Sequence, residues 1–127
     1  MMAQHADATF PALPAGSALD TLIATKVMGW TPCRNLNFKG EEELIWLEDH
    51  PPQSWAHREF QPSTQIADAW RVIEHLFADG CTIAIHSRTP GWTVILDEQN
   101  PDRVEIRAET APLAICLAAR HLREQTA

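Results

Sequence analysis

The segment CTIAIHSRTPGWTVILDEQNPDRVEIRA, residues 81–108, decides the predicted fold. Apolar and polar side chains alternate in residues 81–87, 91–97 and 103–108, with the period of β-strands. Proline-containing turns, RTPG and EQNPD, separate the three stretches. Because turns this short join only antiparallel neighbours, the segment predicts an antiparallel meander of three strands.

Helices are predicted before and after this meander. SALDTLIATKVMGW, residues 17–30, carries an apolar stripe and reaches Gly29, a residue type that often closes a helix in the left-handed conformation. The last helix is predicted to begin at Thr110, with Pro112 in its first turn. The following LAICLAA is apolar on almost all sides, so we expect this helix to lie deep in the core.

A further helix is predicted between these two, with Ser63 or Thr64 as its cap and Gly80 at its end. An apolar stripe runs along it at spacings of four, three and four residues and consists of Ile66, Trp70, Ile73 and Phe77, and Ala69 and Leu76 widen this face. This spacing places the stripe on one side of a helix. We expect that side to face the core.

The region between the first two helices contains weaker patterns. ELIWLE, residues 43–48, is typical of a strand, and SWAHREF, residues 54–60, is interpreted as a shorter extended piece. Residues 31–43 contain Pro32 and Gly40 and show no alternation. We interpret them as irregular.

The strand pattern also indicates how the elements are layered. Ile95 lies on the opposite face of its strand from Trp92 and Leu96, so both faces of the sheet carry apolar residues. Such a sheet calls for helices on both faces. We therefore predict an α+β fold, a three-layer α/β/α sandwich around an antiparallel sheet. Residues 1–16 are interpreted as a flexible N-terminal tail and residues 17–127 as a single domain.

Composition excludes several classes of partner. The chain has 10 Lys and Arg against 17 Asp and Glu, a formal net charge of −7. This balance argues against general nucleic-acid binding, which needs a basic footprint, and against docking on anionic membranes. A local basic pocket is still compatible with it.

The cysteines and the apolar runs bear on the compartment. Cys33, Cys81 and Cys116 stand singly, and an odd number without C-x-x-C favours free thiols in a reducing compartment. The first residues lack the pattern of a secretory signal, and no apolar run approaches the roughly 20 residues of a spanning helix. We expect a cytoplasmic protein.

Four blocks of the sequence resemble the phage ABA sandwich domain family of small phage and prophage proteins. They are KVMGW (26–30), FQPSTQIADAW (60–70), GW (91–92) and TAPLAICLAA (110–119), in the expected order. The resemblance implies the same three-layer sandwich and a place in the cytoplasm of the host cell. It carries over no catalytic residue. The chain departs from the family pattern at Gln65, where an acidic residue is usual.

The start of the second helix is the candidate ligand site. Ser63, Thr64 and Gln65 precede a helix N-terminus, where backbone N–H groups and the helix dipole favour a phosphate. Arg58 would add a bidentate charge and Trp55 a stacking surface for a base. The alternative is that the two hydroxyl groups only cap the helix.

Two classes of function follow from these patterns. One is a non-enzymatic binding protein that sequesters a small phosphorylated or nucleotide ligand, such as a host defence signal. The other is a protein-interaction module that binds or blocks a host or phage protein. No catalytic, cofactor or metal motif stands out, and an enzyme is the least favoured class. Five Trp and an apolar last helix favour a homo-oligomer.

Overall fold

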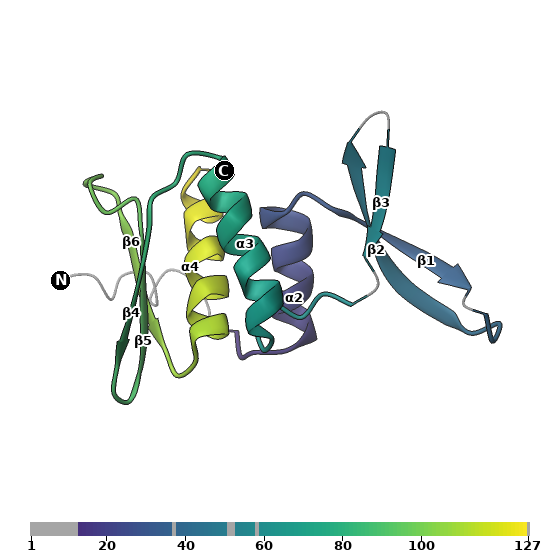
Figure 1. The fold of residues 1–127 in the computed structure, drawn as a ribbon, viewed down its shortest axis with the longest axis horizontal. Helices are drawn as coiled ribbons and strands as arrows, with labels where there is room; N and C mark the ends of the chain where they lie inside the picture. Colours follow the sequence, from purple (N-terminus) through teal and green to yellow (C-terminus); the bar gives the residue numbers. More distant parts are fainter. Residues whose placement is uncertain (1–12, 37, 51–52, 58, 127) are drawn as a thin grey trace.

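The computed structural model describes residues 13–36, 38–50, 53–57 and 59–126 (Figure 1). Its helices and strands, in chain order, are α2 (Ser17–Leu22), the π-helical turn η1 (Ile23–Val27), β1 (Thr31–Leu36), β2 (Glu42–His50), β3 (Gln53–His57), α3 (Ile66–Ala78), β4 (Ile83–Arg88), β5 (Gly91–Leu96), β6 (Val104–Ala108) and α4 (Ala111–Thr126). The strands form two antiparallel sheets, with orders β1-β2-β3 and β4-β5-β6. The α+β class with antiparallel pairing is thus confirmed.

The predicted meander is the β4-β5-β6 sheet. Its register pairs Ile85 with Val94 and Val94 with Ile106, so the apolar rows of the three strands align. Gly91 opens β5 where the chains approach closely, since a Cβ placed on it would lie 2.5 Å from the carbonyl oxygen of Ala108. The GW pair therefore needs its glycine for steric reasons.

α4 is the central helix, as the apolar sequence predicted. It packs on β5 and β6, and on its other sides it meets α3 and η1. Residues Ala114, Ile115, Cys116, Ala118 and Ala119 are buried. Thr110 accepts a hydrogen bond at Oγ1 from the N–H of Leu113 at 3.3 Å, which caps the predicted start.

The predicted first helix is present, with a wider last turn. The N–H of Met28 donates to the carbonyl of Ile23 at 2.9 Å, which is the π-helical spacing. Gly29 follows in the left-handed region, with φ of 74°. Trp30 then folds back onto the helix end, donating its backbone N–H to the carbonyl of Ala24, and is buried.

α3 buries only one side of the face that was predicted to meet the core. Its buried residues are Ala69, Val72, Ile73 and Leu76. Of the predicted face, Ala69, Ile73 and Leu76 are buried as expected, whereas the side chains of Ile66, Trp70 and Phe77 are between 52% and 72% exposed. The prediction that Trp70 faces the core is therefore wrong. The smaller Ala69 and Val72 allow α3 to approach α4 closely, and the aromatic side chains are turned away from that contact.

The second sheet includes a strand that was predicted as irregular chain. β1 pairs with β2 along its whole length, from Thr31 opposite Leu47 to Leu36 opposite Glu42. Pro32 is compatible with pairing here because β1 is an edge strand. Trp30 and Phe60, at the two ends of this excursion, meet with ring centroids 4.6 Å apart.

The described residues do not show helices on both faces of the β4-β5-β6 sheet. Figure 1 shows α2, α3 and α4 on the same side of it, and the second sheet lies beyond them. The opposite face carries exposed His86, Glu105 and Arg107 beside the half-buried Ile95. Ala84 lies beside Ile95 on this face, and the three-layer α/β/α arrangement is not confirmed by the described residues.

Candidate functional site

The predicted ligand residues are only partly within the described chain. Arg58 and the side chain of Trp55 lie outside what the structure describes. Ser63, Thr64 and Gln65 lie in and after a turn that precedes α3. Ligand binding at these residues stays a prediction.

Ser63 is held within the protein. It is 1% exposed, and its Oγ accepts a hydrogen bond from the N–H of Gly16 at 2.9 Å. Its own N–H donates to Oδ1 of Asp20 at 2.8 Å. Asp20 is itself only 8% exposed. The pair of bonds joins the start of α2 to the approach of α3, so Ser63 has a structural role.

Thr64 and Gln65 are exposed, but the helix start next to them is already acidic. Gln65 is the N-cap residue of α3 and makes no side-chain capping bond. Asp68, in the first turn, accepts a hydrogen bond from the N–H of Gln61 at 2.8 Å. Its carboxylate occupies the positive end of the helix dipole and would repel a bound anion. This arrangement weakens the case for a phosphate at this end of α3.

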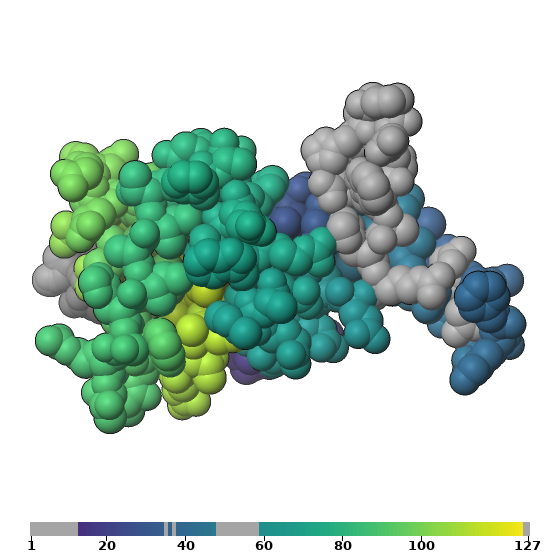
Figure 2. Space-filling model, viewed as in Figure 1, coloured from purple at the N-terminus to yellow at the C-terminus, as the bar shows by residue number. Residues whose placement is uncertain are grey.

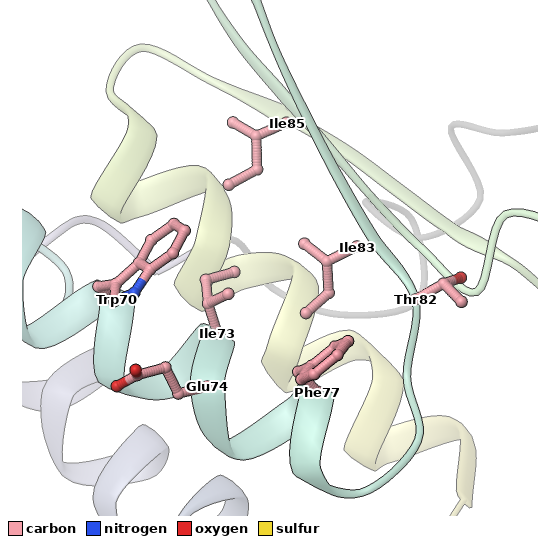
Figure 3. A pocket seen from close by; sticks show the side chains of 7 residues that line it. All are labelled: Trp70, Ile73, Glu74, Phe77, Thr82, Ile83 and Ile85. Carbon is pink, nitrogen blue, oxygen red and sulfur yellow. The ribbon is translucent and has the colours of Figure 1, made fainter.

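A groove with a mostly apolar lining lies between α3 and β4. Its volume is about 890 Å³. Figure 3 shows Ile83 and Ile85 of β4 directed toward Trp70, Ile73 and Phe77 of α3, with Glu74 and Thr82 at the margins and directed away from the centre. The lining consists of Trp70, Ile73, Glu74 and Phe77 from α3, with Thr82, Ile83 and Ile85 from β4 and its approach. In Figure 2, α3 in teal lies beside the green β4-β5 hairpin on the face in view.

The groove exposes large apolar side chains to solvent. Trp70 is 52% exposed and Phe77 is 72% exposed. Ile66, one turn before Trp70, is 56% exposed and extends the same stripe. Apolar side chains gathered on one surface in this way mark interaction sites more often than scattered ones do. The sequence signal was the four-three-four stripe itself, which was assigned to the core.

The floor of the groove is formed by a free sheet edge. Thr82 and Asp97 form a hydrogen-bonded pair, since the N–H of Asp97 donates to the carbonyl of Thr82 at 2.9 Å. Antiparallel pairs alternate, so the backbone groups of Ile83, Ile85 and Ser87 point away from β5. β4 is the terminal strand of its sheet among the described residues. These donors and acceptors are therefore available to an incoming strand.

α3 is fixed in place at the start of the groove by an aromatic cluster. The guanidinium carbon of Arg71 lies 5.1 Å from the Trp30 ring centroid and 5.3 Å from that of Phe60. Asp68 lies on the other side of Arg71, with an N–O separation of 3.7 Å. Cation–π contacts and the ion pair orient α3, so the groove wall is preformed.

Other sites are not indicated in the part of the chain that the structure covers. No group of three or more His, Cys, Asp or Glu side chains there is arranged to hold a metal ion. No helix described is long and apolar enough to cross a membrane. Cys33, Cys81 and Cys116 are free thiols, in agreement with their isolated positions in the sequence.

Comparison with known proteins gives one match. The family model described as the phage ABA sandwich domain matches residues 21–120, which include α2 from its fifth residue through most of α4. Neither the curated proteins nor the solved structures compared with the chain give a match. The matched residues contain both sheets and both walls of the groove, and the chain belongs to the phage ABA sandwich domain family.

Proposed function

We propose that this phage-family protein is a non-enzymatic interaction module that binds an extended segment of a partner protein in the groove between α3 and β4. The observation that carries the proposal is the combination of a free strand edge with exposed Trp70 and Phe77 above it. A strand added to the edge of β4 forms backbone hydrogen bonds with it. Every second side chain of that strand then points into the apolar groove.

The lining also indicates the chemistry of the segment. Glu74 is the charged residue of the lining, beside Ile73 and Phe77. A partner segment with large apolar residues at alternate positions and a Lys or Arg opposite Glu74 complements this surface in shape and charge. A segment with an acidic residue at that position is disfavoured.

The sequestration of a small phosphorylated or nucleotide ligand at the start of α3 receives less support. Ser63 is buried and bonded to Gly16, and Asp68 places a carboxylate in the first turn. We therefore favour protein binding over this ligand hypothesis. Association of identical chains is also proposed, and a single-chain mass by light scattering at micromolar concentration would contradict it.

The proposal is tested by selecting displayed random peptides on the full chain and measuring the affinity of the enriched sequences by fluorescence anisotropy. We expect alternating apolar residues with a basic residue between them. Trp70→Ala removes the largest aromatic side chain of the wall, and loss of such an anchor costs about 2 kcal/mol, roughly thirtyfold in affinity. Trp92→Ala is the matched control, because Trp92 is also exposed but does not line the groove.

A charge exchange separates this mode of binding from non-specific apolar adhesion. Glu74→Lys should weaken the selected basic peptide and strengthen a copy in which Glu replaces the basic residue. Ile85→Lys should weaken both peptides, because it places a charge on the groove floor. Peptides whose affinity responds equally to Trp70→Ala and Trp92→Ala, or fails to respond to Glu74→Lys, would refute the proposal.

A further inference from the structure

The free edge of β4 has few of the features with which edge strands avoid pairing. Such strands usually carry Lys or Pro, a bulge, or a covering helix or loop. The sequence of β4, IAIHSR, contains neither Lys nor Pro, and its register with β5 is unbroken from Ile83 to Arg88. α4 packs on β5 and β6, and α3 packs on α4, so neither of these helices packs closely on β4. An edge of this kind is predisposed to pair with another strand.

The sequence of β4 allows it to pair with a copy of itself. Antiparallel hydrogen-bonded pairs form between residues whose backbone groups point outward, which in β4 are Ile83, Ile85 and Ser87. A pair centred on Ile85 places Ile83 opposite Ser87 of the second copy and Ile85 opposite itself. This register uses all three outward residues of both strands. It also sets no two like charges opposite each other.

The same register brings opposite charges together at both ends of the paired strands. Arg88 of one copy lies opposite Thr82 of the other, and Thr82 is bonded to Asp97, whose N–H donates to the Thr82 carbonyl at 2.9 Å. Neighbouring strands are about 4.8 Å apart, and Arg and Asp side chains together span the roughly 10 Å between the two outer backbones. Arg88 thus reaches Asp97 of the second copy. Two-fold symmetry repeats the ion pair, so the dimer has two.

Self-pairing also covers the apolar stripe of α3. The two-fold axis of an antiparallel pair is perpendicular to the sheet, so both copies of α3 lie on the same side of the joined sheet. Trp70 and Phe77, which are 52% and 72% exposed, then approach the α3 helix of the second copy across the axis. Backbone hydrogen bonds, two ion pairs and an apolar contact would all stabilise this one interface.

From this self-complementarity we infer that β4 pairs with β4 of a second copy, and that this pairing regulates the groove by competing with the partner segment. The competition rests on the function proposed above, whereas the pairing itself does not. By alternation, the groove-facing residues of the second copy are Ile83, Ile85 and Ser87, none of which is basic. A partner segment with a basic residue opposite Glu74 gains an ion pair that the second copy lacks. Such a segment therefore displaces the second copy and releases single chains.

Disulfide trapping tests the register. In a Cys33→Ser background the native thiols that remain are the buried Cys81 and Cys116. Ala84→Cys and His86→Cys place thiols on the face away from the groove, where the two positions oppose each other across the pair. Opposed residues are about 5 Å apart, which a disulfide can span, whereas diagonal neighbours are about 7–8 Å apart. We expect a cross-linked dimer when the two variants are mixed and oxidised, and none from either variant alone.

A charge reversal and a competition experiment complete the test. Arg88→Glu should weaken self-association about fivefold in light scattering, because both ion pairs are lost. Arg103→Glu is the matched control, since it changes the net charge equally but precedes β6, at the far side of the sheet, and should leave self-association unchanged. Adding the peptide selected for the groove before oxidation should prevent the cross-link. The copy of that peptide with Glu in place of its basic residue should not.

The outcomes separate this inference from the proposed function. A mixture that fails to cross-link, or single variants that cross-link as fully as the mixture, would overturn the pairing even if the groove binds its peptide. A cross-link that still forms when the peptide is bound would overturn the competition. Failure to select any peptide while the mixture cross-links would refute the proposed function and the competition with it, and leave the pairing in place. Circular dichroism of each variant confirms that it is folded.

Discussion

The buried hydrogen bond between Asp20 and the backbone of Ser63 gives the sharpest prediction on stability. Asp20→Ala removes the carboxylate that accepts the Ser63 N–H at 2.8 Å and leaves that donor buried. A hydrogen bond to a charged group contributes about 1.5–3 kcal/mol, and an unsatisfied buried donor costs about 1–3 kcal/mol. The two figures describe the same lost hydrogen bond and are not added, so we expect the free energy of unfolding to fall by about 2–3 kcal/mol.

Urea denaturation followed by tryptophan fluorescence measures this change. With a dependence of about 1–3 kcal/mol per molar urea for a small protein, the midpoint should fall by about 1 M or more. Asp20→Asn keeps an oxygen that can accept the bond but loses the charge, so it should lie between Asp20→Ala and the unmodified chain. Ser63→Ala should also destabilise, because the N–H of Gly16 loses its acceptor. An unchanged midpoint for Asp20→Ala would refute the structural role assigned to this link.

Three further outcomes are expected. Val72→Ala should lower the free energy of unfolding by about 1–2 kcal/mol, since Val72 is fully buried. Ile66→Ala, on the exposed stripe, should change the free energy of unfolding by less than about 0.5 kcal/mol. Equal effects of the two substitutions in chemical denaturation would contradict the assigned core face. Under native conditions at pH 8, an alkylating reagent should modify Cys33 well before Cys81, because burial raises the pKa of the Cys81 thiol to about 11 and shields the thiol from the reagent. Mass spectrometry of the digested protein gives the order in which the cysteines are modified. The hydrogen bond from the Arg123 guanidinium lowers the pKa of the Asp79 carboxyl, so the ion pair stabilises the fold above about pH 4, and this contribution is lost as the pH falls through the lowered value. Asp79→Asn should therefore cost at most about 1 kcal/mol at pH 7 and progressively less as the pH is lowered below about 4, measured by urea titration at each pH.

The elements whose local patterns agree with their surroundings were predictable from the sequence. The meander follows from alternation and short turns, and the left-handed Gly29 and the Thr110 cap mark helix ends through local chemistry. Both kinds of signal act between residues close in the chain. The tertiary environment therefore had little opportunity to override them.

The orientation of α3 was not predictable in the same way. Periodicity places Trp70 and Phe77 on the same broad apolar face as Ala69 and Ile73, but it does not show which side of that face meets α4. Close packing against α4 favours the small residues, which is a tertiary effect. The same limit applies to Ser63, whose hydroxyl caps nothing because Gly16, far away in the sequence, uses it.

The β1-β2-β3 excursion was missed in part because its first strand satisfies few sequence criteria. Residues 31–36, TPCRNL, show no apolar alternation and contain a proline. Their extended conformation comes from backbone pairing with β2, which depends on no particular side chain. An edge strand formed in this way cannot be recognised from the pattern of its side chains.

The meeting of Trp30 and Phe60 has a consequence for how this chain should tolerate changes in length. The chain leaves the helices at Trp30 and returns at Phe60, and the two rings are in contact, so the ends of the excursion stay together whatever lies between them. Doubling the length of such a closed segment adds only about 0.6 kcal/mol of loop entropy. Among the described side chains of the excursion, Trp46 is the one that joins the central cluster of buried residues. Residues 31–59 are therefore the place where insertions, deletions or a grafted hairpin would disturb the helices and the groove least, provided that an aromatic side chain still fills the position of Trp46.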